Sequence, residues 1–177
     1  MKKATFLLIG ILYSITCLSQ RVVSLSNIVT VEFPRKAEKI NKTQALSHAS
    51  KKFKNDKMVL GSIAERNTAT IYKVDDVLIS LFIDNHAVKE EHLSDIKIGL
   101  DEFSKGDSTY TSSLRKVNNN SVVDINYLIG NVGYYHLFCS NVNFTKAVTG
   151  IIEFNKTEKN KATVILDHIL NSITFKE

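Results

Sequence analysis

The clearest hydrophobic pattern of this chain lies near its end, where a strand pattern gives way to a helix pattern. Residues 147–154 are apolar and β-branched and too few to form a helix of their own, which predicts a strand. After a polar break, apolar residues recur at spacings of three and four, as on one face of a helix: Ala162, Ile165, Leu166, Ile169, Leu170 and Ile173. We expect Thr157 or Asn160 to cap this helix, which buries its apolar face on a sheet and leads to a short closing strand.

Similar patterns predict three strands and one short helix in the first half of the chain. Residues 28–33 alternate between apolar and polar positions, which predicts a strand that ends at Pro34. In the polar stretch that follows, Thr43 is expected to cap a helix with a modest apolar stripe made of Ala45, Leu46, Ala49 and Phe53. Two strands at 69–74 and 77–83 are joined by a turn at Asp75 and Asp76, and the second is apolar enough to be covered on both faces.

A second amphipathic helix is predicted after these strands. Its buried stripe has the spacings three, four and three, and consists of Leu93, Ile96, Leu100 and Phe103. Asp101 and Lys105 are placed to form an ion pair four residues apart, and Gly106 suits the left-handed position after a helix end. Within the helix, we therefore expect Phe103 to face the core.

From residue 109 onward the pattern predicts an antiparallel meander. Strands at 109–117, 122–129 and 132–140 are separated by turns at Asn118–Asn120 and at Gly130 and Asn131, and another turn at 141–146 leads to the strand at 147–154. Tyr134 and Tyr135 are adjacent in a strand, so at most one of them can contribute to an aromatic surface on a given face. The fold class that follows is α+β, a mostly antiparallel sheet with helices packed on it.

The start of the chain is predicted to be a secretory signal peptide over residues 1–19, which leaves a single domain at 20–177. Lys2 and Lys3 precede an apolar stretch too short to span a bilayer, and small residues follow it. We expect cleavage between Ser19 and Gln20, and the segment resembles the signal peptides of Bacteroidetes-type bacteria, which often end before a glutamine. The protein is then exported, either periplasmic or extracellular. In the alternative, Cys17 is the acylated residue of a lipoprotein, and only then does the protein attach to a membrane.

Composition and charge restrict the possible functions. The chain has 177 residues, 44% of them hydrophobic, which is enough for one domain with a sizeable core. Its formal charge is +5, but the basic residues occur singly or in pairs, so nothing favours nucleic-acid binding. After cleavage only Cys139 remains, which excludes an internal disulfide, and its apolar strand predicts a buried thiol.

The order of the elements and the ending of the chain resemble the PsbP-like α/β/α sandwich family. The resemblance is carried by the strand at 149–154 and by the helix and strand between Ile165 and Phe175. The family includes PsbP itself, DcrB-like bacterial envelope proteins and small chaperones of secretion effectors. The resemblance covers residues 28–176 and implies a non-enzymatic adaptor, assembly or chaperone role outside the cytoplasm. It implies no particular functional residue and no cofactor.

The chain carries no nucleophile motif, phosphate-binding loop or dinucleotide-binding motif. The densest group of acidic residues and histidines lies between residues 84 and 95. We interpret its acidic residues as stabilising a helix N-terminus, while the alternative is a divalent metal bound by His86, Glu90, His92 and Asp95. His136 is interpreted as a residue of a strand face.

Two functional hypotheses follow from these observations. The first is an exported binding or assembly module that has no catalytic residue. It holds an envelope protein or a secreted protein as its partner, either on its sheet or in a groove beside its helices. The second is a small secreted hydrolase or metal-binding protein that uses Asp84, His86 and His92, with His136 as a further candidate. A histidine close to a serine, cysteine or second carboxylate in one pocket would favour the second hypothesis.

Overall fold

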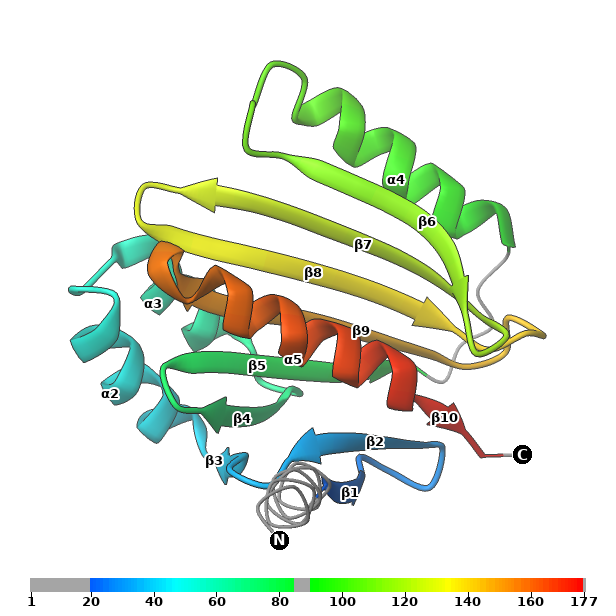
Figure 1. Ribbon diagram of the computed structural model, residues 1–177, viewed down its shortest axis with the longest axis horizontal. Coiled ribbons are helices and arrows are strands. Elements are labelled where there is room, and N and C mark those ends of the chain that lie inside the picture. The colour runs from blue at the N-terminus through cyan, green and yellow to red at the C-terminus, as the bar shows by residue number, and fades with distance from the viewer. Residues whose placement is uncertain (1–19, 85–89, 177) are drawn as a thin grey trace, which may run out of the picture.

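The protein is built around a seven-stranded antiparallel sheet (Figure 1). The computed structural model describes residues 20–84 and 90–176. The strands in spatial order are β3 (Glu38–Ile40), β4 (Thr70–Val74), β5 (Val77–Asp84), β9 (Ala147–Asn155), β8 (Val132–Ser140), β7 (Asn120–Ile129) and β6 (Thr111–Val117). Every neighbouring pair in this order is antiparallel, which confirms the predicted α+β class.

The first face of the sheet is covered by the C-terminal helix α5 (Lys159–Ser172) and by a small second sheet. The small sheet has the order β1 (Gln20–Ser24), β2 (Val29–Pro34) and β10 (Thr174–Phe175). All six apolar residues of the predicted helical stripe between Ala162 and Ile173 are buried, as are Val29, Val31 and Phe33 of β2. Because β10 pairs with β2, the end of the chain closes this layer.

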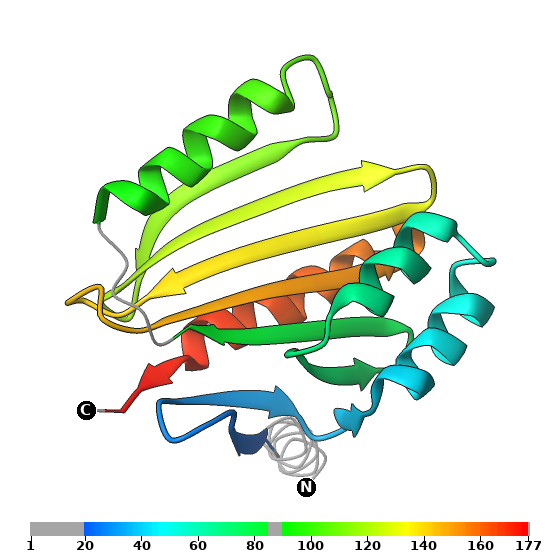
Figure 2. The ribbon, with the colours of Figure 1, turned by 180° about the vertical axis from the view of Figure 1, so that it is seen from behind.

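The second face is covered by two separate groups of helices. The pair α2 (Lys42–Lys52) and α3 (Lys57–Glu65) packs over β4, β5 and β9, and α4 (Glu90–Phe103) packs over β6 and β7. Figure 2 shows these helices in front of the sheet, with α4 at the β6 edge and α5 behind the strands. Within the described residues, no helix is long and apolar enough to cross a membrane.

The sheet is buried on both faces over its central strands, and the two tyrosines of β8 lie on opposite faces, as the predicted alternation requires. Tyr134 packs under α2 and α3, whereas Tyr135 packs under α5, and both are buried. Neither tyrosine is therefore available as an exposed aromatic surface. Cys139 is buried on the same face as Tyr135, as predicted, and burial raises the pKa of its thiol to about 12.

The helix starts differ from the predicted ones. Asn41, not Thr43, caps α2: its side chain accepts a bond from the Gln44 N–H at 2.9 Å, and the Gln44 side chain accepts one from the Asn41 N–H at 2.9 Å. Neither Thr157 nor Asn160 caps α5, because a 3-10 turn (Lys156–Glu158) leads directly into the helix. The short elements α3, β1 and β3 are not predicted by the hydrophobic pattern.

The end of α4 differs from its prediction as well. Phe103 is the last residue of the helix, and its side chain is 89% exposed rather than buried. Because the helix ends there, Lys105 lies in the following turn and cannot pair with Asp101 along a helix face. Asp101 instead accepts from Lys97 at 2.5 Å, one turn earlier. Gly106 adopts a φ of +94°, but in the turn beyond the helix rather than next to its last residue.

The predicted turns of the meander are confirmed. Asn118 and Asn119 have φ values of 48° and 67°, and they connect β6 to β7 as a two-residue turn. Gly130 has a φ of 60° in the tight turn between β7 and β8. The register that these turns set places Ile125 and Tyr127 of β7 on the second face of the sheet, beneath α4.

A buried ion pair joins the end of α3 to the middle of the sheet. The Arg66 guanidinium donates to both carboxylate oxygens of Glu153 in β9, at 2.8 and 2.6 Å, and the two side chains are 4% and 0% exposed. It also donates to the hydroxyls of Ser80 at 2.9 Å and Ser62 at 2.6 Å. Burial raises the pKa of Glu153, and the hydrogen bonds from Arg66 counteract that rise.

Replacing Arg66 alone is expected to destabilise the protein strongly. Arg66→Met leaves the Glu153 carboxylate buried without a partner, which costs about 3–5 kcal/mol of unfolding free energy. Adding Glu153→Leu should recover most of that loss, because no unpaired charge then remains. Urea denaturation monitored by circular dichroism measures both changes.

Arg115→Met is the matched control for this prediction. Arg115 pairs with Asp124 at 2.9 Å, but its side chain is 45% exposed, so its loss should cost less than about 1 kcal/mol. Equal costs for Arg66→Met and Arg115→Met would contradict the structural role assigned to the buried pair.

Candidate functional site

The candidate residues from the sequence fall partly outside the described structure. Cys17, Ser19 and His86 lie outside the described residues, as does the side chain of Glu90. His92 and Asp95 are described, and both are exposed on α4. Among the described residues, no group of three His, Cys, Asp or Glu side chains is placed to hold a metal. A metal site that includes His86 therefore stays an untested prediction.

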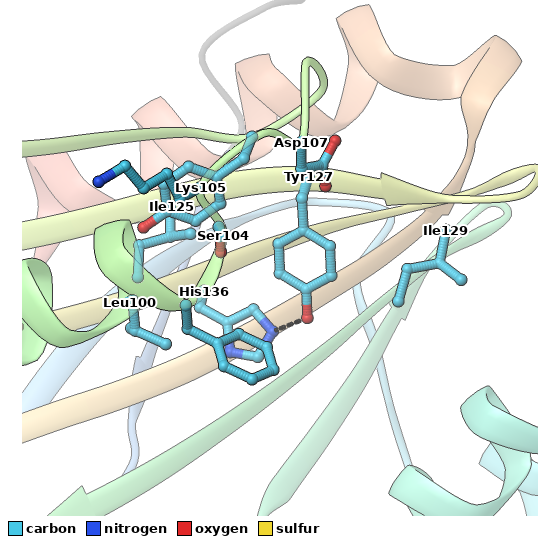
Figure 3. Close-up of a pocket in the computed structure, with 10 residues that line it drawn as sticks. Leu100, Ser104, Lys105, Asp107, Ile125, Tyr127, Ile129 and His136 are labelled. Carbon is cyan, nitrogen blue, oxygen red and sulfur yellow. Dashed lines mark hydrogen bonds between the residues drawn. The ribbon is translucent and has the colours of Figure 1, made fainter.

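A pocket of about 360 Å³ lies on the second face of the sheet, at the C-terminal end of α4 (Figure 3). Its apolar lining comes from Leu100, Phe103, Ile125 and Ile129, and its other rings come from Tyr110, Tyr127 and His136. Ser104, Lys105 and Asp107, from the turn after α4, complete the lining. The pocket thus lies between α4, the turn that follows it, and the strands β7 and β8.

Local sequence features hold the outer wall of this pocket in place. The Asp107 carboxylate accepts from the Thr109 N–H and the Thr109 hydroxyl, both at 2.8 Å, and these bonds lower the pKa of Asp107. The Tyr110 hydroxyl donates to the Asp101 carboxylate at 2.9 Å, which ties the turn back to α4. On the inner wall, Ile125, Tyr127 and Ile129 alternate along β7 and so share one face.

His136 and Tyr127 form a hydrogen-bonded pair in the pocket. The Tyr127 hydroxyl lies 2.9 Å from Nε2 of His136, and Figure 3 shows this bond between two neighbouring strands. The rings are stacked with their centroids 5.5 Å apart, and Tyr134 also stacks with Tyr127, at 5.1 Å. Burial, assisted by the positive charge of Arg66, lowers the pKa of His136 to about 4. The pair is therefore uncharged at neutral pH.

The pocket suits binding better than acid–base or nucleophilic chemistry. In the part of the chain that the structure describes, the His136 ring hydrogen bonds to Tyr127 and not to a serine, cysteine or carboxylate. Burial also raises the pKa of Tyr127, so both groups stay uncharged near neutral pH, away from the pKa range that suits a general acid or base. The pocket contributes apolar walls and hydrogen-bonding groups, which are what a binding site requires.

Sequence reasoning found His136 but missed its surroundings. The alternation of β7 predicts that Ile125 and Tyr127 share a face, yet it does not say that the end of α4 lies opposite them. That placement depends on how α4 docks on the sheet through Leu93, Val123 and Ile125. Phe103 was expected in the core, and its exposure at this pocket could be seen only once the end of the helix was known.

Comparisons with known proteins show the fold and nothing more specific. A scan against protein-family models finds no match, and a search of the curated proteins finds no relative in sequence. The solution structure of cyanobacterial PsbP (CyanoP) from Synechocystis sp. PCC 6803 has a TM-score of 0.54 and 10% identity, over 89% of this chain and 93% of that chain. The Ran-binding protein Mog1p from Saccharomyces cerevisiae has a TM-score of 0.48 and 12% identity, over 88% and 95%. The likeness to CyanoP confirms that the chain has the predicted PsbP-like fold.

The lowered pKa of His136 predicts a loss of stability in mild acid. In the unfolded chain His136 binds a proton below its ordinary pKa of about 6.5, whereas in the folded protein it does so only near pH 4. Stability is therefore fully present above about pH 6.5 and falls as the pH drops to about 4, by up to about 3 kcal/mol. Urea denaturation at a series of pH values measures this loss.

Two variants assign the loss to His136. His136→Gln should reduce the slope of stability against pH, whereas His92→Gln, at an exposed position on α4, should leave it unchanged. The slope should not vanish, because burial lowers the pKa of His48 as well and adds a dependence of the same sign. Identical slopes for the wild type and His136→Gln would show that His136 is not held neutral by the fold.

Proposed function

We propose that this protein is an exported, non-enzymatic binding or assembly module of the bacterial envelope, and that it holds a protein partner at the pocket between α4, β7 and β8. The observation that carries the proposal is Phe103, a large apolar side chain that is 89% exposed at a mostly apolar pocket. Ile129, at the same pocket, is 37% exposed. A partner that covers these side chains removes apolar surface from water, which favours association.

The uncharged His136–Tyr127 pair supports a binding role for this pocket. A site that recognises a partner needs few polar groups in fixed positions, and the pair supplies them between apolar walls. Among the described residues, His136 bonds to the Tyr127 hydroxyl and not to a serine, a cysteine or a carboxylate, the partners expected under the hydrolase hypothesis.

Export is proposed from the sequence pattern of residues 1–19. Lys2 and Lys3 precede an apolar stretch too short to span a bilayer, and small residues follow it up to the proposed cleavage between Ser19 and Gln20.

Loss of the Phe103 ring is expected to abolish or greatly weaken partner binding. Covering a Phe side chain fully contributes about 1.5–3 kcal/mol, so Phe103→Ala should weaken the complex by about tenfold or more. Immobilised wild-type and variant proteins are incubated with an envelope extract, and the retained proteins are identified and quantified by mass spectrometry.

Ile98→Ala is the matched control for this capture experiment. Ile98 is an exposed apolar residue of the same helix, 58% accessible, and does not line the pocket. The proposal expects one set of proteins to be retained by the wild type and Ile98→Ala and to be lost with Phe103→Ala. Retention of the same proteins by all three, or of none above background, would refute it.

The mature N-terminus tests the proposed export. Mass spectrometry of the protein isolated from its native envelope or culture medium should give a chain beginning at Gln20. A chain that begins at an acylated Cys17 would replace the secreted form with a lipoprotein, and an intact Met1 in the cytosol would contradict export altogether.

A further inference from the structure

Aromatic rings are concentrated in the pocket at the end of α4. Three of its ten lining residues are Phe or Tyr, namely Phe103, Tyr110 and Tyr127, whereas aromatic residues make up 8% of the chain. His136 adds a fourth ring. Rings favour other rings through offset stacking and edge-to-face contacts, which add to the gain from burial alone. The lining therefore favours a flat aromatic group over a branched aliphatic one.

The pocket offers no net charge and no buried charge to a ligand that enters it. Its two charged lining residues, Lys105 and Asp107, have opposite signs, and both are exposed. An ionised ligand group would lose its hydration in the pocket without gaining a buried partner of opposite charge. Near the exposed residues, one of the two charges would attract it and the other would repel it. An uncharged group avoids both the loss of hydration and the repulsion.

The Tyr127–His136 pair leaves hydrogen-bonding capacity for one polar group of a ligand. A tyrosine hydroxyl has one donor and two acceptor positions, and a neutral imidazole has one donor and one acceptor. The single bond between Tyr127 and His136 uses one donor and one acceptor of this set. A phenol hydroxyl or an indole N–H can therefore donate to the acceptor positions that remain.

The size of the pocket restricts the ligand to a small ring system. Its volume of about 360 Å³ is near the lower end of the range for small-molecule sites. Phe103, at 89% exposure, would lose accessible surface when a ring packs against it.

We propose that this pocket binds an uncharged aromatic ring with one hydrogen-bond donor, a phenol or an indole, presented as a Tyr or Trp side chain of the partner protein. The source of the ring rests on the function proposed above. The recognition of the ring itself does not, because it follows from the lining of Phe103, Tyr110, Tyr127 and His136.

Titrations of the purified, 15N-labelled protein with small probes test the ring chemistry by NMR. The probes are p-cresol and indole, cyclohexanol as a non-aromatic alcohol of similar size, and benzoate and benzylammonium as charged rings. We expect p-cresol and indole to shift the signals around Phe103, Tyr127 and His136, and to bind about tenfold or more tightly than the other three. Equal binding of cyclohexanol, tighter binding of a charged ring, or no shift at these residues would overturn the proposal.

Variants separate the ring contacts from the hydrogen bond. Tyr127→Phe keeps the ring but removes the hydroxyl, so it should weaken p-cresol binding by about fivefold or more and leave toluene binding unchanged. Phe103→Ala should weaken both probes, and Ile98→Ala should weaken neither. If Tyr127→Phe affects toluene as much as p-cresol, the assigned hydrogen bond is wrong.

The source of the ring is tested with N-acetyltyrosinamide, which carries the side chain on a peptide unit. Binding comparable to that of p-cresol supports a partner side chain, whereas binding of p-cresol alone overturns this part of the proposal in favour of a small molecule.

Failure of the ring assignment can be distinguished from failure of the proposed protein-binding function. If partner capture depends on Phe103 but no ring probe binds, only the ring assignment fails; if the probes bind and no partner is captured, only the protein-binding function fails.

Discussion

The structure depends on one constraint, which is that the central strands β5, β9 and β8 are buried on both of their faces. Consecutive side chains of a strand point to opposite faces, so each of these strands must supply two different cores. Tyr134 and Tyr135 illustrate this, because one packs under α2 and α3 and the other under α5. Glycine allows the closest contacts: a Cβ on Gly133 would lie 2.2 Å from the Phe154 ring, and one on Gly150 would lie 2.7 Å from Leu81. A larger residue at either position would have to displace these side chains of the neighbouring strands.

The same constraint explains why a charged pair is found in the centre of the molecule. Glu153 lies in β9 between Ile152 and Phe154, which face α5, so its own side chain points to the opposite face. Arg66 meets it there from the end of α3 and also donates one hydrogen bond to Ser80 of β5. The pair fixes the position of α3 relative to two central strands, a geometry that apolar contacts alone specify less strictly. It also lies close enough to His136 for the Arg66 charge to help keep that ring neutral.

The sequence predicted the structure well where one hydrophobic period extended over a long segment. It did not predict short elements or the contacts between segments that are distant in the sequence. The stripe of α5 and the turns of the meander followed directly from apolar spacing and from residues such as Asn118 and Gly130. By contrast, α3 is nine residues long, and a helix of that length is set by packing more than by its own pattern. Glu153 was a visible signal, since a carboxylate within an apolar strand requires a partner, but Arg66 lies 87 positions away and no local rule connects the two. The pocket could not be derived for the same reason, because its walls come from α4, β7 and β8.

The modest core beneath α4 gives the pocket two walls of different stiffness. Among the described side chains of this helix only Leu93 is buried, whereas α5 has five buried residues along its length. Segments with few buried contacts separate from the rest of a protein at a lower free energy than global unfolding requires. The strand wall, with Tyr127 and His136, is therefore the rigid half of the pocket, and the helix carrying Phe103 is the compliant half. For the proposed binding of a ring, this arrangement allows the width of the pocket to change at the helix wall while Tyr127 and His136 stay in place.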